Sequence, residues 1–285
     1  MLPPEIKQWF ETNYGTIDSV TQASGGCINN GGTIESGKEK FFLKYNSSSN
    51  LPNMFKAEAT GLDLLRKSEL YIPKVIDVFE GLEYDALLLE NVTKSVPNGN
   101  FWSDFGYKLA AMHHITKEFY GLDHNNYMGS LPQENEFVEN WINFFIVRRL
   151  MPQVSLANSK GYFNNSQTSQ FEKFYKKLPE LLNVEIPALV HGDLWSGNFI
   201  INHHGDPVLI DPAVSYSHRE VDLAMTKLFG GFDQQFYEAY LEAYPTVCGL
   251  EDRMDIYNLY PLLIHLNLFG AGYYSQVMHI INRFS

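Results

Sequence analysis

The feature that most constrains this chain is a polar loop enclosed by short apolar segments, late in the sequence. The loop HGDLWSGN spans residues 191–198, between an apolar pair at 189–190 and an apolar triplet at 199–201. A polar turn at 202–206 then leads to a third apolar segment, 208–210, which ends at Asp211. Short apolar runs separated by Gly-containing polar turns predict strands joined by tight loops. The pattern therefore predicts that the acidic and amide side chains here lie at strand ends.

Three of these side chains form an ordered set that is typical of phosphoryl transfer. Asp193 and Asn198 lie five residues apart in the loop, and Asp211 ends the next strand. Phosphotransferases place a base beside metal ligands in this way. Gly192 permits the sharp turn that directs Asp193 into the site, and the oxygens of Asn198 and Asp211 suit Mg²⁺. Each residue alone could be ordinary turn chemistry, but the ordered set favours phosphoryl transfer.

Composition limits the class of protein. The chain has 285 residues, 45% of them hydrophobic and 14% aromatic, which is enough for a sizeable core in one large or two modest domains. A net charge of -12 argues against nucleic-acid binding. Two cysteines imply no disulfide framework, and neither a secretory leader nor an apolar run of membrane-spanning length is found. We expect a cytoplasmic protein that does not bind membranes.

The first part of the chain contains candidate groups for a nucleotide. A glycine-rich segment at 24–32, which includes Gly25 and Gly26, can lie over phosphates or can simply close a hairpin. Lys44, on a strand expected over 40–45, could reach those phosphates or lie exposed at an edge. Glu58 lies on a helix that we expect Asn53 to cap, where it is either a solvated charge or the partner of Lys44. Together they indicate the Lys–Glu pair of a kinase small lobe.

The remaining pattern predicts an α+β bilobal fold. Residues 1–92 form a small lobe with an antiparallel sheet and one main helix, and residues 93–285 form a helical lobe with the catalytic loop. The strand expected over 84–90 leads into a hinge, Glu90 to Val92, whose backbone could contact adenine. Asp222 is expected to be buried and to brace the catalytic loop. Helices are expected over 3–13, 101–114, 136–150, 167–182, 217–225, 232–244 and 252–284, the last interrupted at 270–272, and further strands over 17–23 and 73–79.

These motifs resemble the fructosamine kinase family, which is related to aminoglycoside phosphotransferases within the protein-kinase-like superfamily. The resemblance extends from about residue 17 to residue 284. The Trp within the loop and the run HREVDLAM are more specific to the family than the His-Gly-Asp motif, which many small-molecule kinases share. The residues that carry the resemblance are HGDLWSGN at 191–198, DPAV at 211–214, HREVDLAM at 218–225 and FGGF at 229–232, with support from GGCI at 25–28 and FKAEA at 55–59.

The resemblance implies ATP-dependent phosphorylation of a sugar hydroxyl, at the 3-position, of ketoamines such as fructosamine, ribulosamine or erythrulosamine on protein or free amines. The phosphate then destabilises the adduct, and the amine is released. By position, Asp193 would be the base, Asn198 and Asp211 would hold Mg²⁺, Lys44 would contact the phosphates with Glu58 orienting it, and Trp195 would form a wall for the sugar. The motifs do not separate these substrates, and on the grounds of the resemblance alone we favour the smaller ribulosamine and erythrulosamine.

Two alternatives remain open from the sequence. An aminoglycoside or choline phosphotransferase would share the fold, but Trp195 and the run at 218–225 oppose it. A catalytically inactive pseudokinase is disfavoured because Lys44, Glu58, Asp193 and the two expected metal ligands are all present.

Two departures bear on regulation. Gly192 stands where protein kinases carry an Arg that reads an activation-loop phosphate, so control of that kind is not expected. Cys27 lies in the glycine-rich segment, where the family similarly carries a cysteine, and it is either a redox-sensitive thiol or a small residue that fits a turn. We therefore expect a monomer or a redox-linked homodimer.

Overall fold

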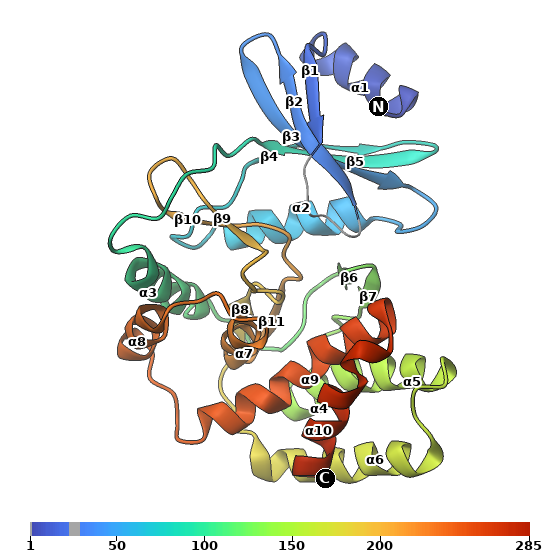
Figure 1. Ribbon diagram of the computed structural model, residues 1–285, viewed down its shortest axis with the longest axis vertical. Helices are drawn as coiled ribbons and strands as arrows, with labels where there is room; N and C mark the ends of the chain where they lie inside the picture. The colour runs from blue at the N-terminus through green and yellow to red at the C-terminus, as the bar shows by residue number, and fades with distance from the viewer. Residues whose placement is uncertain (1, 23–28) are drawn as a thin grey trace. The chain divides into compact units, whose positions relative to one another are not determined.

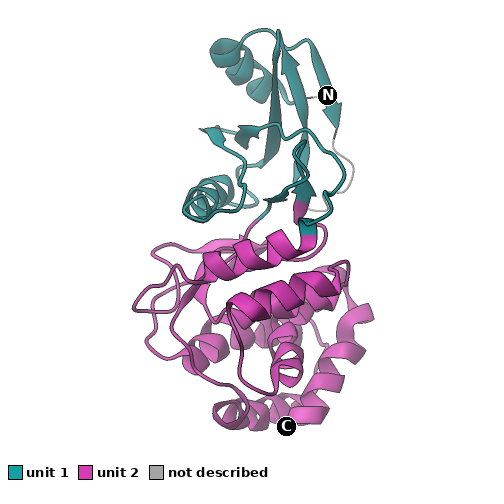
Figure 2. Ribbon diagram, turned by 90° about the vertical axis from the view of Figure 1, so that its left-hand side faces the viewer, with its two compact units in different colours: residues 1–101, 200–211 teal, residues 102–199, 212–285 magenta. Residues whose placement is uncertain are grey.

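The computed structural model describes residues 2–22 and 29–285, and Figure 1 shows the order of their helices and strands. The chain divides into two compact units, coloured separately in Figure 2. The first comprises residues 1–101 and 200–211, and the second comprises residues 102–199 and 212–285. Residues 200–211, which follow the catalytic loop, thus group with the N-terminal unit. The architecture is the α+β kinase-like fold that the sequence predicts.

A five-stranded antiparallel sheet forms the centre of the first unit, in the order β1-β2-β3-β5-β4. Its register places Lys44 on β3 opposite Gly31 on β2 and Leu87 on β5. The strands are β1 (Ser19–Gln22), β2 (Asn30–Ser36), β3 (Glu39–Ser47), β4 (Val75–Glu80) and β5 (Tyr84–Glu90). The unit also contains β10 (Pro207–Leu209) and all but the first residue of its partner β9 (Phe199–Ile201).

Two helices lie on different sides of this sheet (Figure 1). Helix α1 (Pro4–Tyr14) buries Ile6 and Phe10 against a cluster that includes Leu43 of β3. Because successive strand residues point to opposite faces, Lys44 points away from that cluster and toward helix α2 (Met54–Leu65). The alternation along β3 therefore directs one buried cation to the α2 side.

The expected cap of α2 is wrong. Asn53 adopts a left-handed backbone conformation, with φ of 59°, and its side chain makes no capping hydrogen bond. Asn tolerates this region better than most residues, so it serves here as a turn residue rather than as a cap.

The second unit is mainly helical and contains two short antiparallel strand pairs, β6 with β7 and β8 with β11. Its buried side chains include many aromatic rings, as the 14% aromatic content suggests. The elements are α3 (Phe101–His113), β6 (Asn126–Met128), β7 (Leu131–Gln133), α4 (Trp141–Phe144), η1 (Phe145–Leu150), α5 (Met151–Ser159), α6 (Asn165–Leu181), β8 (Ala188–Val190), β11 (Ser215–Ser217), α7 (Glu220–Leu228), α8 (Gln234–Ala243), α9 (Leu250–Phe269), η2 (Ala271–Tyr273) and α10 (Tyr274–Phe284).

Two of the expected helices have boundaries that differ from the structure by three residues or more. The helix expected over 136–150 begins only at Trp141, because Asn140 caps it by accepting the backbone N–H of Asn143 at 3.0 Å. It then continues through the π-helix η1 into α5, ending at Ser159. The helix expected from Ser217 begins at Glu220, since Ser217 still pairs in β11. No helix in the described ranges is both long and apolar enough to cross a membrane.

Candidate active site

The catalytic loop is held in a turn that requires glycine. Gly192 has a φ of +82°, and a Cβ at this position would lie 2.1 Å from the carbonyl oxygen of Ala213. The backbone N–H of Ala213 donates to the carbonyl of His191 at 2.9 Å, so the segment after Asp211 lies directly against the loop. Both the left-handed backbone and the close approach exclude a side chain at 192. The turn that the sequence predicts here is confirmed.

Asn198 fixes the carboxylate of Asp193. The amide nitrogen of Asn198 donates to the backbone oxygen of Asp193 and to its Oδ2, each at 2.8 Å. Asn198 is buried, and Asp193 is half-buried. The loop therefore holds a carboxylate in a defined orientation, as a general base requires.

Asp222 braces the backbone of this loop, which confirms the structural role expected for it. Its side chain is fully buried and accepts the N–H groups of His191, at 2.8 Å, and of Gly192, at 2.9 Å. A third donor, the Nε2 of His113, lies at 3.2 Å. Because the carboxylate is negative, these hydrogen bonds are charge-assisted and stronger than neutral ones.

The imidazole of His113, which contacts Asp222, is neutral and adopts a single tautomer. Burial lowers the pKa of His113, and Asp222 opposes this only in part, so the ring stays neutral near pH 7. A neutral imidazole has one N–H and one acceptor. We assign the N–H to Nε2, facing Asp222, because Nδ1 can then accept the hydroxyl of Tyr240 at 2.7 Å.

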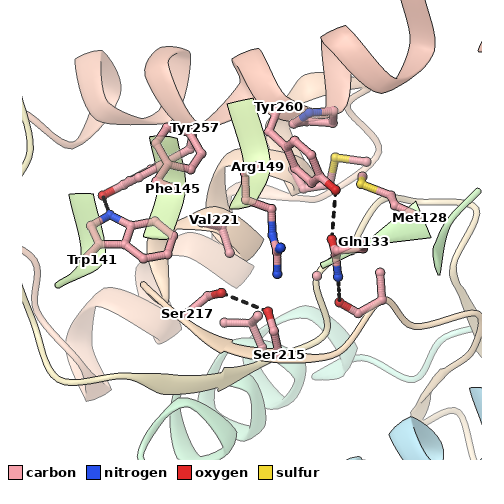
Figure 3. Close-up of a pocket in the computed structure, with 15 residues that line it drawn as sticks. Met128, Gln133, Trp141, Phe145, Arg149, Ser215, Ser217, Val221, Tyr257 and Tyr260 are labelled. Carbon is pink, nitrogen blue, oxygen red and sulfur yellow. Dashed lines mark hydrogen bonds between the residues drawn. The ribbon is translucent and has the colours of Figure 1, made fainter. Parts of the chain in front are cut away.

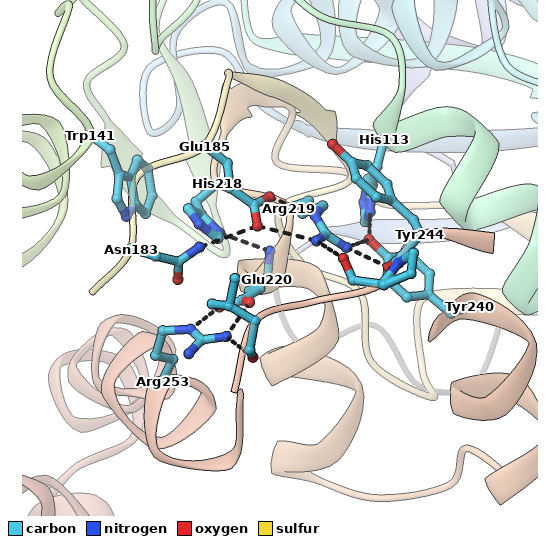
Figure 4. A network of polar contacts seen from close by, with 12 residues as sticks. His113, Trp141, Asn183, Glu185, His218, Arg219, Glu220, Tyr240, Tyr244 and Arg253 are labelled. Atoms are coloured by element: carbon cyan, nitrogen blue, oxygen red, sulfur yellow. Dashed lines mark hydrogen bonds and ion pairs between the residues drawn. The ribbon is translucent and has the colours of Figure 1, made fainter. Parts of the chain in front are cut away.

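A larger network of buried charges continues from Tyr240 (Figure 4). Arg219 donates from Nη1 to the Tyr240 hydroxyl at 3.2 Å and from Nε to Glu185 at 2.6 Å. Glu220 pairs with Arg253 through two contacts of 2.7 Å. Arg219 and Glu220 of the run HREVDLAM are thus each matched by a partner of opposite charge, partly buried Glu185 and buried Arg253, as charges inside a protein require.

In the first unit, Lys44 bridges two carboxylates. Its ammonium lies 2.5 Å from Glu58 Oε1 and also pairs with Asp211. The Lys44 and Glu58 side chains are each 9% exposed. Burial alone would lower the pKa of Lys44, but the Asp211 and Glu58 carboxylates outweigh it and raise that pKa, so the lysine stays charged. The Lys44–Glu58 contact predicted from the sequence is confirmed.

The same cluster perturbs the carboxyl group of Glu58. Burial and the nearby negative charge of Asp211 raise the pKa of Glu58, while Lys44 opposes them. Asp211 itself has a φ of 55°, in the left-handed region where non-glycine residues are uncommon. Backbone strain of this kind concentrates at functional sites.

The expected hinge follows β5. The carboxylate of Glu90 accepts the hydroxyl of Tyr71 and the backbone N–H of Lys74, the latter at 3.1 Å, so its side chain is used within the unit. Nothing in these contacts tests the expected adenine contacts of Glu90 and Val92. Gly25, Gly26 and Cys27 lie outside the described residues.

Trp195 leads to an aromatic cluster that sequence reasoning did not assemble. The Trp195 ring lies over Gly197, where a Cβ would come within 2.3 Å of it, and its centroid is 5.8 Å from that of Phe229. Trp195 is 36% exposed and Phe229 is 38% exposed. The ring of Phe229 in turn packs against the ring of His265, which packs against those of Phe269 and Tyr273. The ring centroids of these pairs are 5.0 to 5.4 Å apart. The sequence signal was present only in part, because Phe229 belongs to the FGGF run, whereas His265 carries no local motif.

Comparison with known proteins agrees with this geometry. The family model "Fructosamine kinase" matches residues 4–285. A protein of Synechocystis named a probable ketoamine kinase is 38% identical over 272 residues, covering 94% of this chain and 90% of the relative. The chloroplastic protein-ribulosamine 3-kinase of Arabidopsis thaliana is 35% identical over 289 residues, covering 98% of this chain and 87% of the relative.

Two solved structures are similar to this chain in fold. A Haemophilus somnus protein assigned as a fructosamine-3-kinase superposes with a TM-score of 0.88 at 29% identity, covering 98% of this chain and 96% of the other. The aminoglycoside phosphotransferase APH(4)-Ia, in a complex with AMP-PNP and hygromycin B, gives a TM-score of 0.66 at 14% identity, with 97% and 98% covered. At that identity the likeness concerns the fold alone.

Proposed function

The chain belongs to the fructosamine kinase family, and we propose that it is an ATP-dependent ketoamine 3-kinase acting on ribulosamine, erythrulosamine or fructosamine groups. The observation that carries the proposal is the catalytic loop, in which Asn198 orients the Asp193 carboxylate beside a tryptophan. Two of the relatives named above support the choice of acceptor, since one is a probable ketoamine kinase and the other a protein-ribulosamine 3-kinase.

On the nucleotide side, Lys44 contacts the phosphates of ATP and Glu58 orients it. Their ion pair supports this role, because a buried cation held by one carboxylate is positioned before the substrate arrives. The glycine-rich segment with Gly25 and Gly26 covers the phosphates, and the backbone from Glu90 to Val92 contacts adenine.

Magnesium fits the residues available. Asp211 offers a carboxylate and Asn198 an amide oxygen, the hard oxygen ligands that Mg²⁺ prefers. The left-handed backbone of Asp211 supports a functional role for this residue. When bound, the ion neutralises charge on the transferring phosphoryl group.

On the acceptor side, Asp193 takes the proton of the sugar 3-hydroxyl. The hydroxyl oxygen bonds to the γ-phosphorus, the bond from that phosphorus to the β,γ-bridging oxygen breaks, and ADP leaves. Trp195 forms a wall for the sugar, and the rings joined to it through Phe229 extend this wall. Phosphate is a better leaving group than hydroxide, so the C3–O bond of the product breaks as C1 loses a proton, and water then hydrolyses the imine at C1 and releases the amine.

The test is a substrate panel. ATP consumption is measured with free and protein-bound ribulosamine and fructosamine, and with kanamycin and choline, for the wild type and for Asp193→Asn. We expect turnover of ketoamines only, and a loss of about 100-fold or more in kcat for Asp193→Asn. Turnover of kanamycin or choline alone would assign the chain to another class of small-molecule kinase. Absence of all turnover would indicate a pseudokinase.

Cys27 adds a proposal on regulation and assembly. A thiol in a phosphate-binding segment experiences positive potential, which favours the reactive thiolate. We expect oxidant to lower activity and to produce a disulfide-linked dimer on a non-reducing gel. Equal behaviour of the wild type and Cys27→Ser under oxidant would refute this role.

A further inference from the structure

A chain of buried amides holds the segment that lies against the catalytic loop. Gln133, at the end of β7, is 3% exposed and donates from Nε2 to the carbonyl of Ala213 at 3.1 Å and to Asn126 Oδ1 at 2.9 Å. Asn126 donates from Nδ2 to the carbonyl of Val214 at 2.8 Å. The two consecutive carbonyls of the segment after Asp211 are therefore both held by side-chain amides.

The orientation of these amides is set by groups that cannot reverse. Backbone carbonyls only accept, so the nitrogens of Gln133 and Asn126 must face them. The oxygen of Gln133 then faces α9, where it accepts the hydroxyl of Tyr260 at 3.0 Å. All three polar contacts of the Gln133 amide are thus determined, and Figure 3 shows Gln133 between Tyr260 and the segment that contains Ser215.

Arg149 determines the orientation of Asn135, the amide at the other end of this hydrogen-bonded series. Its guanidinium, which only donates, bonds from Nη2 to Asn135 Oδ1 at 2.7 Å and from Nη1 to the carbonyl of Glu134. Asn135 must therefore turn its nitrogen to Asn126 Oδ1, which it meets at 2.8 Å. The orientations of Asn135, Asn126 and Gln133 are thus fixed by Arg149 at one end and by the backbone carbonyls at the other.

Arg149 lacks the partner that a buried cation usually has. It is 4% exposed, and within residues 2–22 and 29–285 no carboxylate lies at ion-pair distance from it. The carboxylates of Glu134 and Glu136 pair instead with the neighbouring Arg148. The rings of Phe144 and Tyr260, 4.5 and 5.7 Å away, supply the remaining stabilisation. Because such burial is costly, a function for Arg149 is a reasonable expectation.

Two further observations connect this cluster to the site. Arg149 lies in a π-helix, an arrangement that is frequent at functional sites because it redirects side chains. Arg149, Gln133 and Tyr260 also line a cavity of about 30 Å³, together with Gly192 of the catalytic loop (Figure 3). The cavity lining thus joins the cluster to the catalytic loop.

We propose that Gln133 and Arg149 are positioning residues, which fix the carbonyls of Ala213 and Val214 and thereby hold the catalytic loop through the Ala213-to-His191 hydrogen bond. The proposal rests on the kinase activity proposed above. It explains how a chain with Gly192 in place of the catalytic-loop Arg of protein kinases keeps this segment in place, since buried amides hold its carbonyls.

The first test replaces Gln133 by Glu, which has the same shape but accepts where glutamine donates. We expect kcat with ATP and a ribulosamine adduct to fall by about 10- to 100-fold, with KM for ATP changed by less than about twofold. Gln153→Glu is the control for placing a glutamate at a buried position. Gln153 is also buried, at 4% exposure, but its Oε1 accepts from Asn267, a bond that glutamate keeps.

Hydrogen exchange gives a readout that does not depend on activity. The amide of Ala213 should exchange faster in Gln133→Glu than in the wild type, and should be unchanged in Gln153→Glu. If Gln133→Glu does not fold, Tyr260→Phe removes only the donor to Gln133 and should shift both readouts in the same direction. For Arg149, the Lys variant, which keeps a donor for Asn135, should retain more activity than Arg149→Met.

Either of two results would overturn the proposal. The first is a Gln133→Glu variant whose kcat lies within about twofold of the wild type and whose Ala213 amide exchanges at the wild-type rate. The other is an equal loss of kcat in Gln133→Glu and Gln153→Glu, which would indicate general destabilisation. If the wild type shows no kinase activity, the proposed function fails, and the exchange at Ala213 still decides whether the amides hold the segment.

Discussion

Replacing Asp222 by Asn should loosen the catalytic loop while leaving the shape of the side chain unchanged. In the wild type, Oδ2 of Asp222 accepts the His191 N–H and the His113 Nε2–H, and Oδ1 accepts the Gly192 N–H. An asparagine has one oxygen and one NH₂ group at these two positions. Whichever way it is placed, its NH₂ faces at least one backbone N–H, and that donor loses its acceptor.

The size of the effect follows from the burial of these groups. Asp222 is fully buried, so water cannot replace the lost acceptor. Leaving one buried donor unsatisfied costs about 1 to 3 kcal/mol, and exchanging a charged acceptor for a neutral one weakens the remaining bonds. We therefore expect Asp222→Asn to lower the free energy of unfolding by about 2 to 4 kcal/mol, and kcat to fall by about tenfold or more because the loop is displaced.

Urea unfolding at pH 7 measures the first quantity, and ATP consumption with a ribulosamine adduct measures the second. The urea midpoint should fall while the m-value stays constant, since the change concerns stability rather than the surface exposed. Asp233→Asn is the control, because Asp233 is an exposed cap of α8 and Asn caps equally well. If Asp222→Asn matches this control in both assays, Asp222 does not brace the loop.

Two further predictions follow from buried charges. Lys44→Met leaves the Glu58 carboxylate buried without its cation, so we expect the free energy of unfolding to fall by about 3 kcal/mol and KM for ATP to rise. Lys40→Met, the control, removes an exposed ion pair of the same strand, so KM should be unchanged and stability nearly unchanged. Equal effects of the two substitutions would contradict the argument. Burial lowers the pKa of His218 from 6.5 to about 3, despite the nearby Glu185, so below pH 6.5 the unfolded chain binds a proton that the native chain refuses. This residue therefore lowers the free energy of unfolding by about 1.4 kcal/mol for each pH unit from pH 6.5 toward pH 3, and has no such effect above pH 6.5. Urea unfolding between pH 7 and 5 should show that the free energy of unfolding depends less steeply on pH in His218→Asn, by that amount.

Local rules were enough for the parts of the site that are close in sequence. Gly192 was predictable because a polar loop between two short apolar strands needs a sharp turn, and its φ of +82° confirms this. The Lys44–Glu58 pair was predictable because strand alternation and helix position limit which acidic residue can reach the lysine. The same kind of rule failed at Asn53, where a residue typical of caps occupies a left-handed turn instead.

Contacts between residues far apart in sequence could not be predicted in this way. His113 and Asp222 are separated by 109 residues, and nothing near His113 indicates that its ring will meet a carboxylate. A pair of histidines at a helix end is equally consistent with exposure. Which partner a buried polar group finds depends on how the helices pack, and that is decided by the whole core rather than by a motif.

The run HREVDLAM shows why a motif can be specific without being catalytic. Arg219 is matched by Glu185, Glu220 by Arg253, and Asp222 by the loop itself. A buried charge that loses its partner is costly, so losing either member of a pair is more harmful than replacing both with well-packed apolar residues. Each pair must therefore change together or not at all. This constraint would preserve the run across proteins that share the scaffold beneath the loop, which Asp222 reaches directly.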